Sequence, residues 1–171
     1  MKNIVLIMIL LVSFLSVNAQ DTAKKSRKER KAEKEAKKIE KIKHLINSKT
    51  FVFDATHVMP MGGGTKYLNY DYDVKIEKDT VDSYLPFYGV AYYTDYNPTH
   101  SAFDFKKPVE EYKMEKEKDG YMIDIATRNG MDHINYTFHI SELGFATLHV
   151  TSTNRQSISY YGTINEIEKN E

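Results

Sequence analysis

The 171-residue sequence contains no cysteine and no tryptophan, and only 4 prolines and 8 glycines. The absence of cysteine excludes disulfides, thiol nucleophiles, cysteine-ligated zinc and an acylated cysteine as a lipid anchor. An excess of charge of one sign is also missing, because 24 Lys and Arg residues balance 24 Asp and Glu residues. The fold must therefore be held together by packing and backbone hydrogen bonds.

A long apolar run occurs only at the start of the sequence, from Ile4 to Val17. It follows a short positive segment and leads into Val17-Asn18-Ala19, whose spacing of small residues is typical of a signal-peptidase site. The run is shorter than the ~20 apolar residues that span a bilayer. We therefore expect residues 1–19 to be a signal peptide cleaved after Ala19, and the mature chain to be exported to the periplasm or outer envelope without a transmembrane span.

The charges are unevenly distributed along the mature chain. Residues 20–50 carry 12 Lys or Arg and 5 Asp or Glu, whereas residues 51–171 carry 11 and 19. The first segment has high helix propensity, and it ends in an apolar stripe formed by Ile39, Ile42, Leu45 and Ile46. We expect a basic helix over residues 24–49 whose last turns pack on the following domain. Its charge is either solvated or in contact with an anionic surface, and the lack of interleaved aromatic residues argues against nucleic acid.

From Phe51 onward the apolar period changes from 3.6 to 2, which predicts half-buried strands. Successive alternating segments between Val109 and Ile164 predict a five-stranded antiparallel meander, and earlier strands are expected near Phe51, Tyr67 and Tyr88. A one-sided sheet needs a cover. We therefore expect residues 51–171 to form a single, mainly β domain that closes as a barrel or a two-layer sandwich, preceded by one N-terminal helix.

Turn residues predict the pairing of strands within the meander. We expect two-residue hairpin turns at Asn129-Gly130 and at Asp119-Gly120. A three-residue loop over 153–155 is expected to place Val150 opposite Ile158. All three registers keep the apolar residues on a common face, so the predicted meander is internally consistent.

The segment between residues 84 and 96 is crowded with aromatic residues and interrupted by Pro86 and Gly89. Not all of these rings can enter a core, and an aromatic surface with tyrosine hydroxyls suits a sugar, a lipid headgroup or a peptide. The alternative is that the rings form the core of the first strands. The candidate ligand-binding residues are Tyr84, Phe87, Tyr88, Tyr92, Tyr93 and Tyr96.

Two histidines, His139 and His149, occupy non-core positions of neighbouring strands. The connection over 141–144 sets His149 opposite Thr137 or Asn135, so the two histidines are diagonal neighbours at best. With a nearby carboxylate such a pair can hold zinc or copper. Solvated polar residues on a sheet face are the simpler interpretation.

The segment Met59-Pro60-Met61-Gly62-Gly63-Gly64 is not a phosphate-binding loop, because no Lys-Ser/Thr pair and no helix follow it. A flexible hairpin connection is the expected structure. Its two methionines are soft ligands of the kind that suit copper(I). Two thioethers alone are an incomplete ligand set.

Catalytic patterns are absent from the sequence. The adjacent carboxylates Glu110 and Glu111 point to opposite faces of a strand and cannot act as an acid and base pair. No nucleophile-elbow sequence is present. We therefore expect no catalytic residue and no cofactor.

Several short segments together resemble the DUF4251 family in their order and spacing. They are Phe51-Val52-Phe53-Asp54-Ala55, Ser83-Tyr84-Leu85-Pro86-Phe87-Tyr88-Gly89, Gly144-Phe145-Ala146-Thr147-Leu148 and Ile158-Ser159-Tyr160-Tyr161-Gly162. The resemblance covers about residues 38–164. It implies an exported, β-rich protein of Bacteroidetes-type bacteria, and it implies no reaction and no catalytic residues.

The function expected from these features is binding or scaffolding by an exported, non-enzymatic β domain, with an envelope component or a small ligand as the partner. The alternative is a lipocalin-like carrier, in which a closed barrel keeps a cavity for a small apolar molecule. An internal cavity of several hundred Å³ would favour the carrier. A filled interior with a groove outside would favour the binding module.

Overall fold

The computed structural model describes residues 26–93 and 102–168. The expected signal peptide over residues 1–19 and the candidate Tyr96 lie outside these residues. The chain divides into two compact units between Lys34 and Glu35. Within the described residues, no helix combines the length and the apolar character needed to cross a membrane.

In the part of the chain that the structure describes, one helix, α2, precedes the strands and runs from Arg27 to Asn47. It begins with a capping box, because the Ser26 hydroxyl accepts a hydrogen bond from the Glu29 backbone N–H and the Glu29 carboxylate accepts one from the Ser26 N–H. It ends where Lys49 adopts a positive φ of 52°, the left-handed conformation that commonly terminates helices. Both ends of the expected basic helix are thus set by local contacts.

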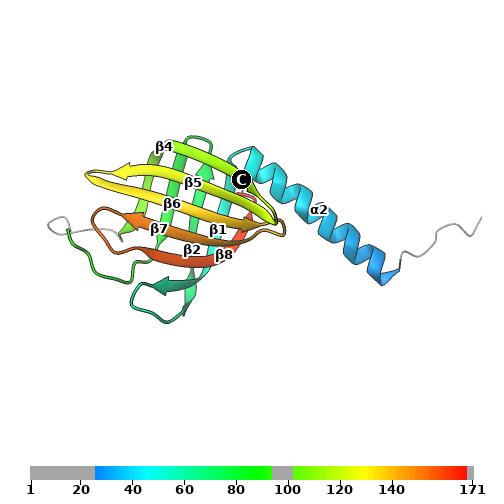
Figure 1. Cartoon of the computed structure of the whole chain (residues 1–171), viewed down its shortest axis with the longest axis horizontal. Helices are drawn as coiled ribbons and strands as arrows, with labels where there is room; N and C mark the ends of the chain where they lie inside the picture. Colours follow the sequence, from blue (N-terminus) through cyan, green and yellow to red (C-terminus); the bar gives the residue numbers. More distant parts are fainter. Residues whose placement is uncertain (1–25, 94–101, 169–171) are drawn as a thin grey trace, which may run out of the picture. The chain divides into compact units, whose positions relative to one another are not determined.

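Eight antiparallel strands form a closed barrel, in which each strand pairs with its neighbours in sequence and β1 pairs with β8 (Figure 1). The predicted antiparallel β fold is confirmed, and its closure is a barrel. The third strand ends at Leu85, before the strand expected near Tyr88, because Pro86 has no N–H to continue the ladder. The strands are β1 (Thr50–Pro60), β2 (Lys66–Glu77), β3 (Thr80–Leu85), β4 (Phe103–Glu117), β5 (Gly120–Asn129), β6 (Asp132–Ser141), β7 (Phe145–Ser152) and β8 (Ile158–Asn165).

The interior of the barrel is filled by side chains from all eight strands. Phe138 packs edge-to-face against Phe51 and Phe53, with ring centroids 5.9 and 5.7 Å apart. An eight-stranded barrel has room for its own side chains or for one small ligand. Here large rings occupy that room, and those that are fully buried are Tyr136, Tyr160, Phe51, Phe53, Phe103 and Phe138.

The C-terminal part of α2 covers one end of the barrel (Figure 1). Ile42, Leu45 and Ile46 are buried and belong to the same apolar core as the barrel interior. A Cβ placed on Gly144, in the turn between β6 and β7, would lie 2.6 Å from the Ile42 side chain. The apolar stripe predicted at the end of the helix therefore packs on the domain.

A buried carboxylate organises the opposite end of the barrel. Asp132 is 3% exposed, and it accepts hydrogen bonds from the hydroxyls of Ser152 and Thr153. The backbone N–H of Asn154 and the guanidinium of Arg155 also contact it. This network joins the start of β6 to the loop between β7 and β8.

The predicted turn at Asn129-Gly130 is wrong by one residue, which shifts the pairing register by two. Arg128 pairs with His133 and not with Met131, so the loop is Gly130-Met131. Within this loop only Gly130 has a positive φ, of 65°. A two-residue turn with glycine first requires that pattern, whereas the expected Asn-Gly turn needs a positive φ at both residues.

The turn predicted at Asp119-Gly120 is wrong in the same way, because Glu117 pairs with Gly120 and the loop is Lys118-Asp119. Gly120 lies within β5, where a Cβ would come within 2.0 Å of the Ile140 carbonyl oxygen. A glycine is therefore needed at this position because two strands approach each other closely. The register predicted between β7 and β8 is confirmed, since Val150 lies opposite Ile158. The connection itself runs over 153–157 and is longer than the predicted three residues.

Closure between β1 and β8 should depend on Gly162, since a Cβ there would lie 2.0 Å from the Asp54 carbonyl oxygen and 2.9 Å from the Phe53 ring. We expect Gly162→Ala to lower the free energy of unfolding by at least about 2 kcal/mol, measured by urea denaturation. Gly62→Ala is the control, because nothing lies within 4 Å of its Cβ, and it should change stability by less than about 0.5 kcal/mol. Equal effects would contradict this account of closure.

The barrel should lose stability at alkaline pH, because burial raises the pKa of Tyr112 to about 12 and raises the pKa of Tyr136 and Tyr160 further. In the unfolded chain these tyrosines ionise at pH ~10, whereas in the folded chain they remain neutral at that pH. The free energy of unfolding therefore keeps its full value below pH ~10 and falls as the pH rises towards 12. The Tyr112 hydroxyl has no hydrogen-bond partner. Tyr112→Phe should therefore be as stable as the wild type at pH 7, and its urea midpoint should fall less at alkaline pH. Tyr67→Phe, at an exposed tyrosine, should match the wild type. Identical pH profiles for all three proteins would contradict the claim that buried Tyr112 contributes to the alkaline loss.

Candidate functional site

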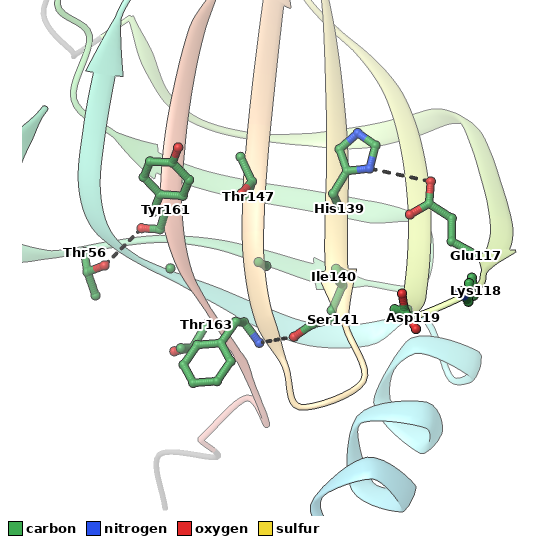
Figure 2. A pocket seen from close by; sticks show the side chains of 14 residues that line it. Thr56, Glu117, Lys118, Asp119, His139, Ile140, Ser141, Thr147, Tyr161 and Thr163 are labelled. Carbon is green, nitrogen blue, oxygen red and sulfur yellow. Dashed lines mark hydrogen bonds and ion pairs between the residues drawn. The ribbon is translucent and has the colours of Figure 1, made fainter. Parts of the chain in front are cut away.

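A shallow groove lies on the outer wall of the barrel, over β6, β7, β8 and β1 (Figure 2). It exists because the outward positions at its centre carry small residues, Thr147 on β7 and Thr163 on β8. Its volume is about 730 Å³, and we call it the outer groove. The larger side chains stand at its rim: Tyr161, Phe145 and His139.

Strand register places the rim of the outer groove. His139 on β6 pairs with Thr147 on β7, and Thr147 pairs with Tyr161 on β8. Adjacent strands are ~4.8 Å apart, so the His139 and Tyr161 backbones are separated by about 10 Å. Figure 2 shows the small Thr147 side chain between the two rings. The depression is thus a direct result of a small residue between two large ones.

Polar groups of the outer groove are largely fixed by neighbours. The Thr56 hydroxyl donates to the Tyr161 carbonyl oxygen over 3.1 Å, and the Ser141 hydroxyl accepts from the Phe145 N–H over 3.1 Å. The His139 Nδ1 lies 3.8 Å from a Glu117 carboxylate oxygen (Figure 2). The groove therefore presents hydroxyls and one carboxylate–imidazole pair in set positions.

Two aromatic rings of the outer groove are open to solvent. Phe145 is 60% exposed and Tyr161 is 41% exposed. The Lys38 ammonium from α2 lies 5.2 Å from the centre of the Phe145 ring, which is within cation–π range. An exposed ring beside fixed hydroxyls can contact both the apolar and the polar faces of a ligand.

The sequence-predicted aromatic residues lie elsewhere, at the end of β3 and in the following loop. Tyr84, Tyr88, Tyr92 and Tyr93 are 45%, 38%, 67% and 59% exposed, so they do not form a core. Phe87 alone turns inward, packing edge-to-face against Phe103 at 5.6 Å. The surface alternative of the prediction therefore describes the four tyrosines better than the core alternative.

Two of these residues join a tyrosine cluster that the sequence did not indicate. The Tyr84 ring lies 5.2 Å from Tyr72, which in turn lies 6.1 Å from Tyr70. The Lys66 ammonium lies 4.5 Å from the centre of the Tyr88 ring, and burial raises the pKa of Tyr72, with the nearby tyrosines adding to the effect. Tyr70 alternates in step with the buried Leu68 and Val74 but is 73% exposed, because β2 pairs with β3 only from Asp73 onward.

The two candidate metal-binding histidines have separate partners. His149 lies opposite Thr137, one of the two predicted registers. Its Nδ1 lies 2.9 Å from the Ser159 hydroxyl, whereas His139 faces Glu117. Across residues 26–93 and 102–168, no group of three His, Cys, Asp or Glu side chains is placed to hold a metal ion. The structure thus gives the two histidines no shared third ligand of these types.

The outer groove was not predicted from the sequence, although two of its rim residues belong to segments named there. Phe145 and Tyr161 lie in the segments that carry the family resemblance. The signal available in the sequence was an aromatic residue at an outward position of each strand, where alternation does not need one. The groove itself depends on residues from strands far apart in the sequence.

Comparison with known proteins agrees with the fold. The model of the DUF4251 family, a domain of unknown function, matches residues 33–164. The crystal structure of a DUF4251 family protein from Bacteroides eggerthii DSM 20697 superimposes with a TM-score of 0.58 and 14% identity, covering 77% of this chain and 89% of that chain. No curated protein matches. Because the family match extends from α2 into β8, the chain belongs to the DUF4251 family.

Proposed function

We propose that the protein is a non-catalytic binding module of the bacterial periplasm or outer envelope, and that it binds a neutral carbohydrate in the outer groove. The observation that supports this most directly is the contrast between a barrel interior filled with rings and an outer wall hollowed by small residues. The ligand is therefore held by the wall of the barrel.

The filled interior argues against the lipocalin-like carrier. Phe51, Phe53, Phe138, Tyr136 and Tyr160 are all fully buried where a carrier keeps its ligand cavity. Admitting an apolar molecule would require several of these rings to move out of a close-packed core. Each ring contributes about 1.5–3 kcal/mol by burial, so this rearrangement is costly.

The chemistry of the outer groove fits a sugar better than an anion or a lipid. Its charged lining residues are Glu117, Lys118, Asp119 and His139, which give no net positive charge for phosphate. Hydroxyls of Thr56, Ser141, Thr147 and Thr163 also line it. A sugar ring has an apolar face that stacks on an aromatic ring, such as Tyr161 or Phe145, and hydroxyls at its edge that exchange hydrogen bonds with the threonines.

A hydrolytic role for the same groove is less well supported. The Glu117 and His139 side chains are 49% and 51% exposed. Catalytic groups act most strongly in preorganised sites from which water is excluded. A solvated pair on an open wall fits ligand contact better than catalysis.

The apolar start of the sequence is what supports the envelope location.

The proposal predicts that filling the centre of the outer groove abolishes sugar binding. Thr147→Trp should block it, and Tyr161→Ala should weaken it by removing a stacking surface worth about 1 kcal/mol or more. We expect the wild type to bind at least one neutral oligosaccharide on a glycan array, and Thr147→Trp to lose at least ten-fold in affinity, which is about 1.4 kcal/mol.

Thr151→Trp is the matched control, since Thr151 is also on β7 and half-buried but does not line the groove. It should bind like the wild type, with unchanged thermal stability in all variants. No binding to any neutral glycan, or equal loss in both tryptophan variants, would contradict the proposal. Loss on Tyr84→Ala alone would move the site to the tyrosine cluster.

A further inference from the structure

We propose that Met59, Met61 and His149 form a copper(I) site on the outer wall of the barrel. These three residues, which lie on β1, just after β1 and on β7, line one depression of about 350 Å³. The thioether pair was incomplete in the sequence, and closure of the barrel supplies an imidazole from a strand far along the chain. The site is separate from the outer groove and shares no lining residue with it.

Strand register brings the three ligands together. Met59 pairs with Ser159 on β8, and Ser159 pairs with His149 on β7. The Met59 and His149 backbones are therefore two strand spacings apart, about 10 Å. A small serine lies between them, so both long side chains can reach the space above it. Met61, the first residue after β1, lines the same depression.

A β-bulge is what turns the methionines outward. Phe51, Phe53 and Ala55 are buried, and strict alternation from them would also place Met59 inside. The register shifts between Ala55 and His57 in both pairings of β1, and Val58 is the next fully buried residue. Bulges re-aim side chains in this way, and here the bulge exchanges the faces of the strand before Met59.

The imidazole of His149 is positioned as metal-binding histidines commonly are. Its Nδ1 lies 2.9 Å from the Ser159 hydroxyl. When Nδ1–H donates to that hydroxyl, the lone pair of Nε2 is left for a ligand, and such a partner fixes both the tautomer and the ring orientation. Ser159 is thus a positioning residue for the proposed site.

Met61 has the exposure expected of a ligand and not of a core residue. It is 69% exposed, and its sulfur lies 3.9 Å from the Ser157 hydroxyl. The turn that follows is open, since a Cβ on Gly63 or Gly64 would meet no atom within 4 Å. Met61 can therefore turn over the depression without disturbing packing.

The donor set selects the metal. Two thioethers and one imidazole are soft or intermediate ligands, which favour copper(I) over magnesium, calcium or manganese. No Asp or Glu lines the depression; the remaining lining residues are Pro60, Gly63, Gly64, Thr65, Ser157, Ile158 and Ser159. A neutral donor set suits a monovalent ion better than a divalent one. Thioethers also survive in an oxidising compartment, where thiols pair as disulfides.

The test is an anaerobic titration of the mature protein with copper(I) in competition with a chromophoric chelator. We expect one equivalent to bind, and Met59→Leu, Met61→Leu and His149→Gln each to lower the affinity at least about 10-fold. Met131→Leu and His139→Gln are matched controls, since Met131 is 87% exposed and His139 lies on a neighbouring strand. Both controls should bind like the wild type.

A second readout identifies the ligands without relying on affinity. Silver(I) is used in place of copper(I) to record NMR spectra of the methionine methyl groups. It should shift the signals of Met59 and Met61 while leaving those of Met114, Met122 and Met131 in place. The same spectra report whether each variant is folded. The proposal is overturned if no copper(I) binds, if the ligand variants bind like the wild type, or if silver shifts all five methyl signals equally.

Discussion

Pairing between the first and last strands, β1 and β8, is the contact on which the rest of the molecule depends. It runs from Val52 opposite Asn165 to Pro60 opposite Ile158. Without it, both strands would be sheet edges with unpaired backbone groups, which invite association with other chains. The pairing passes over Gly162, where any side chain would collide with the Asp54 carbonyl oxygen. A single residue without a Cβ thus permits closure of the barrel.

Closure has a consequence for function through packing. Once the sheet is a barrel, its inward residues must fill a fixed volume, and large aromatic rings do so. The last turns of α2 supply Ile42, Leu45 and Ile46 to the same core. The inward side chains therefore serve to fill the core, and only residues of the outer wall are free of this packing constraint. The outer groove and the methionine–histidine depression both use the wall near the β1–β8 seam, so they result from the same event.

Much of the fold could be predicted from alternation, because period-2 burial reports the strands directly. The two hairpin turns were each misplaced by one residue, because the resulting two-residue shift of register leaves every side chain on its face. Only the backbone of Gly130 and the close contact at Gly120 distinguish the alternatives. Exposure of the tyrosines near Tyr84 was anticipated as one of two alternatives. The outer groove was not, because no local pattern shows that Thr147 lies between His139 and Tyr161.

The bulge in β1 shows most clearly why local patterns stop short of sites. Phe51, Phe53 and Ala55 obey the period of 2, and extending that period would bury Met59. One extra residue reverses the faces, so that Val58 enters the core while Met59 turns outward towards Ser159 and His149. The cost of a disrupted ladder is local, whereas the gain is an outward thioether beside an imidazole. In this barrel, the bulge that interrupts the two-residue alternation of β1 is therefore the best place to look for a metal-binding function.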